Sequence, residues 1–484
     1  MKPRIMLVNP PKSRTHFTGC DNYFPLGLLS LATVLKVDNI DIKIIDMENT
    51  FYGKEINPEI LNSYIENELH YFIRDYKPDI IGIGCLFSGA FDSLKKVVRS
   101  IKFKYPAVPI VIGGIHPTTL PREILHKYVD IDYIILGEGE QSFLNLIRCL
   151  NGNGALTGID GIAFRINSAD NICLQPKTSF IADLDALPQV DYSFLNLREY
   201  YNMDTSKWYS PNNIKIGQPF PIISSRSCPQ RCSFCSMWLV HGPRFRARSS
   251  ENVINEIGYL YDIYGANYFQ FMDDNMTFDK KRTIEICNGI LRKNLNIQFD
   301  TPNGLAISRL DKEVIDAMIS AGWVWTAVAV ESGSDYIRNK VMKKGLSAEK
   351  IYEVVSELAK YSNLFIKGFF IAGMPEDTLD TLEETYKMIK ELPFDKISVN
   401  FPAPYPGTEL FKYCMEHNLI NYKLEDYIDI EVSQDGDTYP HFKPHNLNCC
   451  DLVDFRKKCF DFMREKRASC SFPSNYPLRF KRAI

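Results

Sequence analysis

The stretch Ser225-Arg226-Ser227-Cys228-Pro229-Gln230-Arg231-Cys232-Ser233-Phe234-Cys235 places three cysteines in the spacing CxxxCxxC. A cubane of four irons is held by cysteine thiolates, and a single loop can bring three sulfurs to three irons when its cysteines lie a few residues apart. Three ligands leave one iron open, and an open coordination position is typical of a catalytic metal site. We therefore expect Cys228, Cys232 and Cys235 to bind a 4Fe-4S cluster.

A zinc knuckle is the alternative for the same three cysteines, with His241 as the fourth ligand. Zinc modules of this kind are small and rich in loops. Here the cysteines follow a short apolar run and open a long alternation of strand and helix patterns. The context favours the iron-sulfur cluster.

Residues 220–410 alternate short β-branched or aromatic runs with amphipathic stretches. Six βα units in order predict an open or partial (β/α)6 barrel, with active residues on the loops that follow the strands. The expected strands are Pro221–Ser224, Tyr268–Met272, Gln298–Gly304, Trp325–Glu331, Phe365–Ile371 and Lys396–Phe401.

The first 150 residues show the same alternation and predict a Rossmann-like, doubly wound α/β domain, in which ligands bind beyond the carboxyl ends of the strands. None of the loops at those ends reads GxGxxG, so a dinucleotide is not expected. The expected strands are Ile5–Val8, Ile42–Ile45, Ile80–Gly84, Ile110–Ile112 and Tyr133–Leu136, and the expected helices are Leu26–Lys36, Asn57–Tyr76, Phe91–Lys104 and Gln141–Leu150.

Domain boundaries follow from these patterns and from the length of 484 residues, which is enough for two or three cores. Residues 1–150 form the first domain, 151–215 a linker with some hairpin character, 216–415 the barrel, and 416–484 a C-terminal segment without a clear period. The whole is an α/β protein.

The composition narrows the function classes. With 56 Lys plus Arg against 59 Asp plus Glu, the net charge of −3 gives no reason to expect nucleic acid. No apolar run is long enough for a membrane span, and the start MKPRIMLVNPP reads as a strand rather than a signal peptide. We expect a cytoplasmic protein, in which thirteen cysteines serve metal or redox chemistry rather than disulfides.

The barrel half resembles the radical S-adenosylmethionine superfamily. The resemblance rests on the cysteine motif and on three later runs, Phe271-Met272-Asp273-Asp274-Asn275, Glu331-Ser332-Gly333-Ser334 and Gly368 to Gly373. It implies that S-adenosylmethionine chelates the open iron and is contacted by Phe234, Asp273, Asp274, Glu331, Ser332 and Gly373. Two alternatives stay open: Asp273 and Asp274 could cap the following helix, and Glu331 could pair with Arg338.

The first domain resembles that of cobalamin-binding radical enzymes, through a GGxHPT loop at Gly113–Thr118 and a GEGE turn at Gly137–Glu140. The cobalamin motif DxHxxG is absent, so the resemblance implies cobalamin without a histidine on its lower face. The alternative is a Rossmann-like domain that has lost its cofactor. The implied cobalamin contacts are Asn9, Pro10, Ser88, Gly113, Gly114, His116, Thr118, Gly137, Glu138 and Gly139.

Together the two resemblances imply an enzyme that methylates an unactivated carbon. Its cofactors would be a 4Fe-4S cluster, S-adenosylmethionine and cobalamin, and the protein would position them and exclude water. The implied partners are a small-molecule or natural-product substrate and an electron donor such as flavodoxin or ferredoxin. The alternatives are a cobalamin-dependent radical cyclase or rearrangement enzyme, and a cobalamin or iron-sulfur sensor without turnover.

Two further features invite interpretation. Cys449, Cys450, Cys459 and Cys470 could bind a second cluster, although adjacent cysteines are poorly placed to reach separate irons and free cysteines often fill cores. The aromatic residues of 192–208, including Tyr200 and Tyr201, could line a substrate or cofactor wall, although a packed seam between domains is the commoner outcome.

Overall fold

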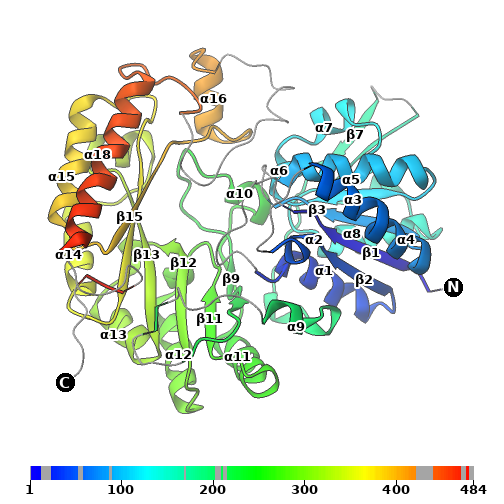
Figure 1. The fold of residues 1–484 in the computed structure, drawn as a ribbon, viewed down its shortest axis with the longest axis horizontal. Coiled ribbons are helices and arrows are strands. Elements are labelled where there is room, and N and C mark those ends of the chain that lie inside the picture. The colour runs from blue at the N-terminus through cyan, green and yellow to red at the C-terminus, as the bar shows by residue number, and fades with distance from the viewer. Residues whose placement is uncertain are drawn as a thin grey trace. The chain divides into compact units, whose positions relative to one another are not determined.

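The computed structural model describes residues 2–11, 23–52, 58–86, 90–167, 171–201, 209–210, 215–420, 440–469 and 476–478. Its described residues divide into two compact units. The first unit holds the chain up to residue 201 together with the short segment Leu239–Gly242, and the second holds the other described residues. Each unit is built around a sheet of its own (Figure 1).

The sheet of the first unit has seven strands in the order β2-β1-β3-β4-β5-β6-β7. Strands β1 to β5 pair in parallel, and β6 and β7 add an antiparallel hairpin at one edge. This order confirms the predicted doubly wound fold. The strands are β1 (Arg4–Asn9), β2 (Asp41–Asp46), β3 (Ile80–Gly84), β4 (Ile110–Gly113), β5 (Tyr133–Ile135), β6 (Ile162–Arg165) and β7 (Ile172–Gln175).

Helices cover both faces of this sheet. From β1 the sheet grows toward β2 in one direction and toward β3 and β4 in the other. Because the crossovers are right-handed, the helices of the two directions lie on opposite faces of the sheet. The helices α1 (Leu26–Val37) and α8 (Glu140–Leu150) pack together, whereas α5 (Phe91–Lys104) contacts the π-helical stretch Ile65–Leu69. The parallel strands are therefore apolar on both faces, as burial on both sides requires.

The first unit differs from the sequence expectation in two details. The helix expected up to Tyr76 runs as α3 (Pro58–Tyr64), the π-helical stretch and α4 (His70–Tyr76). Short helices α6 (Ile115–Thr119) and α7 (Pro121–Lys127) form after β4, where only a loop was expected. Proline at the first position of α7 suits a helix start but reads as a loop in the sequence.

The second unit contains six parallel strands in the order β15-β14-β13-β12-β11-β8. All strands follow one another in chain order from β8 to β15, which confirms the predicted partial (β/α)6 barrel. The strands are β8 (Phe220–Ile222), β11 (Tyr268–Phe271), β12 (Gln298–Leu305), β13 (Trp323–Glu331), β14 (Phe365–Ile371) and β15 (Lys396–Asn400), and β9 (Ser225–Arg226) pairs separately with β10 (Arg246–Ala247).

The helices between these strands begin at side-chain caps. Ser, Asp or Thr just before each helix accepts a hydrogen bond from the backbone N–H three residues on, which satisfies an otherwise unpaired donor. The capping residues are Ser249, Asp279, Asp311, Ser347 and Thr378, for α11 (Ser250–Tyr264), α12 (Lys280–Arg292), α13 (Lys312–Ser320), α14 (Ala348–Leu358) and α15 (Leu379–Glu391).

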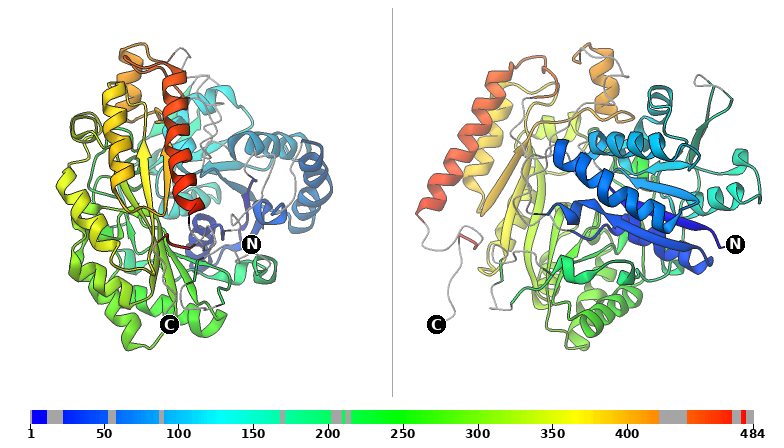
Figure 2. Two further views of the ribbon diagram at one scale, coloured as in Figure 1. Left: turned by 60° about the vertical axis from the view of Figure 1, so that its left-hand side comes forward. Right: turned by 45° about the vertical axis from the view of Figure 1, so that its right-hand side comes forward.

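Two helices complete the second unit beyond β15. The helix α16 (Glu409–Glu416) is followed, after residues outside the described set, by the long helix α18 (Cys449–Ala468). Figure 2 shows α18 beside α15, and it contacts both α15 and β15. The sequence of this segment has no clear period, because α18 buries only a narrow stripe of four side chains.

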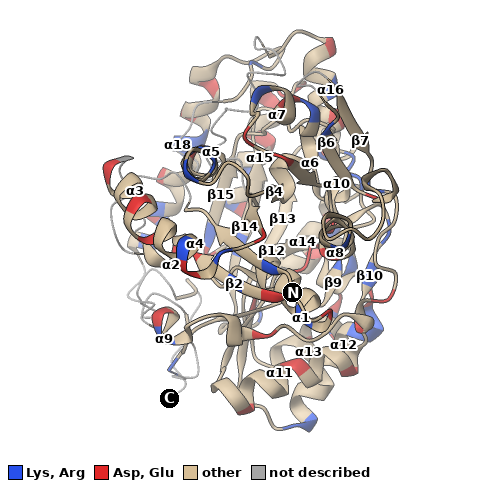
Figure 3. Cartoon of the chain, turned by 90° about the vertical axis from the view of Figure 1, so that its right-hand side faces the viewer, with Lys and Arg blue, Asp and Glu red and all other residues tan. Residues whose placement is uncertain are grey.

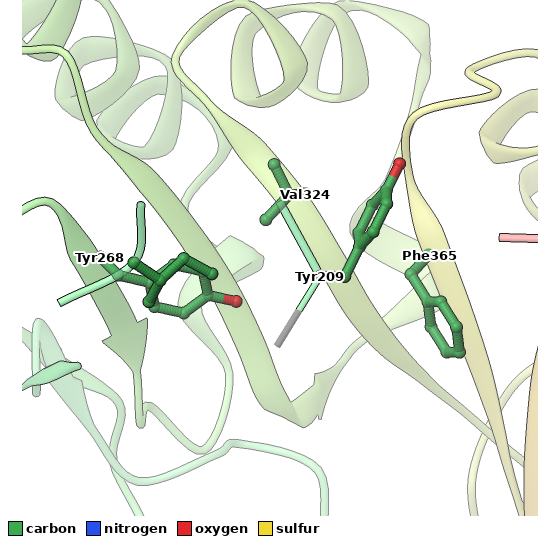
Figure 4. Packing of buried hydrophobic residues seen from close by; sticks show 5 residues of the cluster. Tyr209, Tyr268, Val324 and Phe365 are labelled. Carbon is green, nitrogen blue, oxygen red and sulfur yellow. The ribbon is translucent and has the colours of Figure 1, made fainter. Parts of the chain in front are cut away.

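The inner face of the barrel sheet is the face opposite to these helices. At the amino ends of its strands lies a floor of apolar side chains, formed by Tyr209, Ile216, Tyr268, Val324 and Phe365. Figure 4 shows four of them, which come from three separate strands and from the segment before β8. The floor closes one end of the barrel, and the loops after the strands lie at the other.

Candidate active site

The cysteine loop of the second unit follows β9 and is fixed at several points. Ser233 donates its N–H to the carbonyl of Met342 at 3.0 Å and its hydroxyl to the carbonyl of Val341 at 2.8 Å. Leu410 donates its N–H to the Ser233 carbonyl at 2.9 Å. The segment between Cys232 and Cys235 is therefore held by two distant parts of the same unit, which limits the movement of the three thiols.

The thiols themselves suit metal ligation. All three cysteines are partly exposed, so an incoming cluster can reach them. Burial raises the pKa of Cys232 to about 12 and that of Cys235 to about 11, so metal binding must displace protons from these thiols. Asn275 donates its side-chain N–H to Sγ of Cys228 at 3.5 Å, a contact that sequence reasoning did not assign.

In the zinc alternative, His241 would be the fourth ligand beside the three cysteines. His241 has another contact, since its Nδ1 lies 3.4 Å from Oε1 of Glu138 within the first unit.

The paired aspartates after β11 hold the start of the cysteine loop. Asp273 accepts hydrogen bonds from the N–H of Ser224 at 3.2 Å, from the Ser224 hydroxyl at 2.7 Å and from the Ser225 hydroxyl. Asp274 accepts the N–H of Ser227 at 3.0 Å. The helix-capping alternative is wrong, because the next long helix is capped by Asp279. Contact of these carboxylates with S-adenosylmethionine stays a prediction.

Glu331 ends β13 with a left-handed backbone, φ +69°, which is uncommon for a residue with a side chain. Its Oε1 lies 2.7 Å from Nζ of Lys344, so the alternative pairing with Arg338 is wrong. Arg338 instead donates to backbone carbonyls, including that of Ser332 at 2.7 Å, and to Asp335. Lys344 also attracts the thiolate forms of Cys232 and Cys235, which lowers their pKa values against the larger effect of burial.

The remaining residues predicted to contact S-adenosylmethionine lie on the same unit. Ser332 shares a hydrogen bond of 3.2 Å with the Thr385 hydroxyl, and Gly373 donates its N–H to Asp377 at 2.9 Å. Gly373 needs to be glycine, because its φ is +96° and a Cβ there would lie 2.8 Å from Leu452. Phe234 is half-buried. Their roles toward the cosubstrate stay predictions.

In the first unit, loops after adjacent strands meet at the carboxyl end of the sheet. Gly114 has φ +117°, and a Cβ there would lie 2.3 Å from the carbonyl oxygen of Cys85, so only glycine allows this approach. Gly113 accepts the N–H of Cys85 at 2.8 Å. The loops after β3 and β4 are thereby joined through their backbones.

The loops after β4 and β5 are joined through a side chain. Thr118 donates its hydroxyl to the Gly114 carbonyl at 2.7 Å and accepts the N–H of Gly137 at 3.0 Å. Glu138 is almost fully buried and accepts the N–H of Ile181 at 3.2 Å. Gly139 precedes the first residue of α8. The GGxHPT and GEGE runs therefore form one connected edge.

The other predicted cobalamin contacts have separate surroundings. Asn9 donates to Oδ1 of Asp46 at 2.8 Å, and Tyr200 donates to the other oxygen of that carboxylate, whose pKa burial raises. Pro10 is buried. The ring of His116 lies 4.6 Å from that of Phe91. Ser88 lies outside the described residues.

The described aromatic residues that were candidates for a substrate or cofactor wall lie in the first unit. Tyr192 and Tyr200 are buried with their rings 5.0 and 4.7 Å from Phe24, whereas Tyr201 is exposed. Residues 202–208 lie outside the described set. Within the described part, these tyrosines belong to the core of the first unit.

The C-terminal cysteines form no metal site among the described residues. Cys449 and Cys450 are exposed at the start of α18, Cys459 is fully buried, and Cys470 lies outside the described residues. Burial raises the pKa of Cys459 to about 12, as in an inert core thiol.

Acidic and basic residues are interspersed over the outer helices in Figure 3. No helix among the described residues is sufficiently long and apolar to span a membrane.

Comparisons with known proteins agree with the two units. Residues 21–147 match the B12 binding domain family, and residues 222–389 match the radical SAM superfamily. The uncharacterized methyltransferase of Pyrococcus horikoshii is 30% identical over 86% of this chain and 84% of its own length.

Other curated relatives include two kinds of enzyme. The cytidylyl-2-hydroxyethylphosphonate methyltransferase of Streptomyces wedmorensis is 26% identical over 86% of this chain and 83% of its own length. The anaerobic magnesium-protoporphyrin IX monomethyl ester cyclase of Rubrivivax gelatinosus is 26% identical over 93% of this chain and 75% of its own length.

A solved structure shows the same fold. The radical S-adenosylmethionine methyltransferase TsrM from Kitasatospora setae, with cobalamin and a [4Fe-4S] cluster bound, aligns with a TM-score of 0.69 at 18% identity. The alignment covers 95% of this chain and 85% of TsrM. Both halves of the fold therefore occur together in another protein in the same order.

Proposed function

Because the chain belongs to the radical S-adenosylmethionine superfamily, in the branch that carries a B12-binding domain, we propose that it methylates an unactivated carbon of a small-molecule substrate. The chain is an enzyme that uses a 4Fe-4S cluster, S-adenosylmethionine and cobalamin. The observation that carries the proposal is the anchored loop of Cys228, Cys232 and Cys235 on a chain whose first unit has a B12-binding fold.

The donor set of the second unit fits a cluster with one open iron. Cys228, Cys232 and Cys235 supply three thiolates from one loop, and the two partner networks at Ser233 and Asp273 hold that loop. When bound, the reduced cluster would supply the electron for cleavage of S-adenosylmethionine into methionine and a 5′-deoxyadenosyl radical, and cobalamin would carry a methyl group taken from a second S-adenosylmethionine. Lys344 places a cation beside the cysteines, which stabilises their thiolate forms.

Residues near the cysteine loop would orient the cosubstrate. We assign this role to Phe234, Asp274, Glu331, Ser332 and Gly373 on their placement after the barrel strands. Asp273 is a positioning residue in this scheme, because its carboxylate is buried by its hydrogen bonds to Ser224 and Ser225.

The connected edge of the first unit would receive cobalamin. Gly113 lies on this edge, and a Cβ there would contact only Ile135, at 3.5 Å from its carbonyl oxygen and 3.8 Å from its Cβ, so the backbone at 113 has room for a ligand to approach. Thr118, Gly137, Glu138 and Gly139 keep the neighbouring loops in place. His116 packs on Phe91, which supports binding without this histidine on cobalt.

The test is anaerobic reconstitution of the full chain with iron, sulfide and cobalamin, followed by assay for 5′-deoxyadenosine and S-adenosylhomocysteine. The proposal expects both products in the presence of a reductant and a candidate substrate, and neither from the Cys228→Ala, Cys232→Ala, Cys235→Ala variant. Absence of both products from protein with an intact cluster would contradict methyl transfer. Binding of cofactors without 5′-deoxyadenosine would indicate a sensor.

A cyclase is the second candidate, since a ring-forming relative spans most of this chain. A cyclase would release 5′-deoxyadenosine without a methylated product. For either reaction we propose a small flavoprotein or ferredoxin as electron donor and the cytoplasm as location.

A further inference from the structure

One lysine on the inner face of the barrel, Lys367, has no anionic partner among the residues that the structure describes. Lys367 lies on β14, two residues after Phe365, whose ring stacks on Trp325 at 6.1 Å and belongs to the apolar floor. The other residues of β14 face the helices, because the ring of Phe370 lies 5.7 Å from that of Phe394, a residue that follows α15. Because side chains alternate along a strand, Lys367 points from the inner face, one inward position above the floor.

The surroundings of Lys367 are apolar or basic. Its Nζ lies 4.9 Å from the centre of the Phe369 ring. The adjacent strand positions are Ala327 on β13 and Lys396 on β15. Within the described residues, Nζ of Lys367 makes no ion pair with a carboxylate.

This arrangement is costly for the protein alone. A largely desolvated ammonium beside a second lysine loses hydration without gaining a counter-ion. Burial and then the charge of Lys396 lower the pKa of Lys367 to about 8. An anion that enters the barrel would remove this cost.

Other polar atoms on the inner face also lack partners. Tyr268 and Gln270 both donate to Oδ2 of Asp300, at 3.0 and 3.2 Å, which leaves Oδ1 of Asp300 and Oε1 of Gln270 buried without a partner. Both amide atoms of the neighbouring Gln298 are also unpartnered. The inner face above the floor is therefore suited to a polar ligand.

We propose that Nζ of Lys367 binds an oxyanion of the substrate, a carboxylate or a phosphoryl group, and thereby selects anionic substrates. The inference rests on the proposed function, because it assumes that the substrate enters the barrel beside the cysteine loop. Lys367 is a specificity-determining residue in this scheme, and the small Ala327 beside it leaves space for the anionic group.

Amine acylation of the reconstituted full chain tests the proposal without knowledge of the substrate. The protein, with S-adenosylmethionine present, is treated briefly with an acetylating reagent at pH 8, and each lysine is quantified by peptide mass spectrometry. The probes are methylphosphonate and acetate, each paired with an uncharged analogue, dimethyl methylphosphonate and acetamide. Lys281, which is exposed on the outer helix α12, is the internal control.

The expected result is slower acylation of Lys367 with either anion, by about threefold at twice the dissociation constant, and no change with the uncharged analogues. Equal acylation with and without the anions would overturn the proposal. So would complete protection by S-adenosylmethionine alone, because the amine would then serve the cosubstrate.

A variant pair provides a second measurement. Methylphosphonate should raise the melting temperature of the wild type and of Lys281→Met, and should leave that of Lys367→Met unchanged. An equal rise in Lys367→Met would contradict the assignment. Release of 5′-deoxyadenosine is scored on the same preparation, so failure of the radical chemistry is distinguished from failure of anion binding.

Discussion

At the scale of single residues, Asn275 is expected to tune the cluster. Its N–H donates to Sγ of Cys228, and such hydrogen bonds stabilise the more electron-rich reduced cluster. Asn275→Leu should therefore lower the midpoint potential by about 20–60 mV, since a hydrogen bond contributes about 0.5–1.5 kcal/mol net and the cluster takes one electron. Potentiometric titration followed by electron paramagnetic resonance measures the shift.

The matched control is Asn255→Leu, which removes an amide on α11 that contacts Lys293 instead of the cysteine loop. Its cluster should keep the wild-type potential. If both variants have the same potential as the wild type, Asn275 does not act on the cluster.

Asp300 should make the second unit less stable as pH rises. Burial raises its pKa to about 7 against hydrogen bonds from Gln270 and Tyr268 that favour the charged form. The folded state therefore holds a proton that the unfolded state releases near pH 4, so stability falls between about pH 4 and 7 and stays low above it. Three pKa units correspond to about 4 kcal/mol.

Asp300→Asn removes this titration. The difference in unfolding free energy between the variant and the wild type should therefore favour the variant more at pH 8 than at pH 5.5. Urea unfolding followed by tryptophan fluorescence reports on this unit, because Trp323 and Trp325 lie on the adjacent strand. An unchanged difference between the two proteins at both pH values would show that Asp300 is not held protonated.

Residues of the site were predictable where their signal is local in the sequence. The three cysteines and the GGxHPT and GEGE runs belong to short motifs, so their spacing alone indicates their chemistry. Asp46 and Tyr200 meet across 154 positions, and Lys344 reaches Glu331 across the π-helical stretch Ile337–Val341. Such contacts depend on the fold, so no local pattern could have identified them.

At the scale of elements, Gly333 sets how closely α15 approaches the end of β13. A Cβ there would lie 2.5 Å from both the Glu384 carbonyl oxygen and Cα of Thr385. These are backbone atoms, which cannot rotate away. Gly333→Ala should therefore displace α15 and cost about 1–3 kcal/mol of unfolding free energy, measured by urea denaturation.

Gly258→Ala is the matched control, because a Cβ at this helical position would make only ordinary contacts, the nearest at 3.5 Å from Lys293. Alanine in the middle of α11 should stabilise the unit by up to about 1 kcal/mol. Equal effects of both substitutions would show that the contact at Gly333 is relieved by a small shift.

The elements that the sequence missed share a weak periodic signal. The helix α18 buries Leu452, Phe455, Cys459 and Met463, a single narrow stripe among charged residues. Its start was nevertheless visible in the capping box of Asn448 and Asp451. The parallel strands were easier to predict, since burial on both faces makes them almost continuously apolar.

At the scale of the whole molecule, the cofactors are expected to bind to separate units. Each unit has its own sheet and buried core, so loss of one cofactor should leave the other binding unit folded. The full-length variant Cys228→Ala, Cys232→Ala, Cys235→Ala should bind one cobalamin per chain, measured by visible absorption, and retain less than about one iron.

Gly113→Leu should keep its iron and lose cobalamin, because its side chain would project from the connected loop edge while the cysteine loop stays intact. Loss of both cofactors from either variant would show that the two sites form only together. Retention of about four irons by the cysteine variant would instead reveal a second cluster.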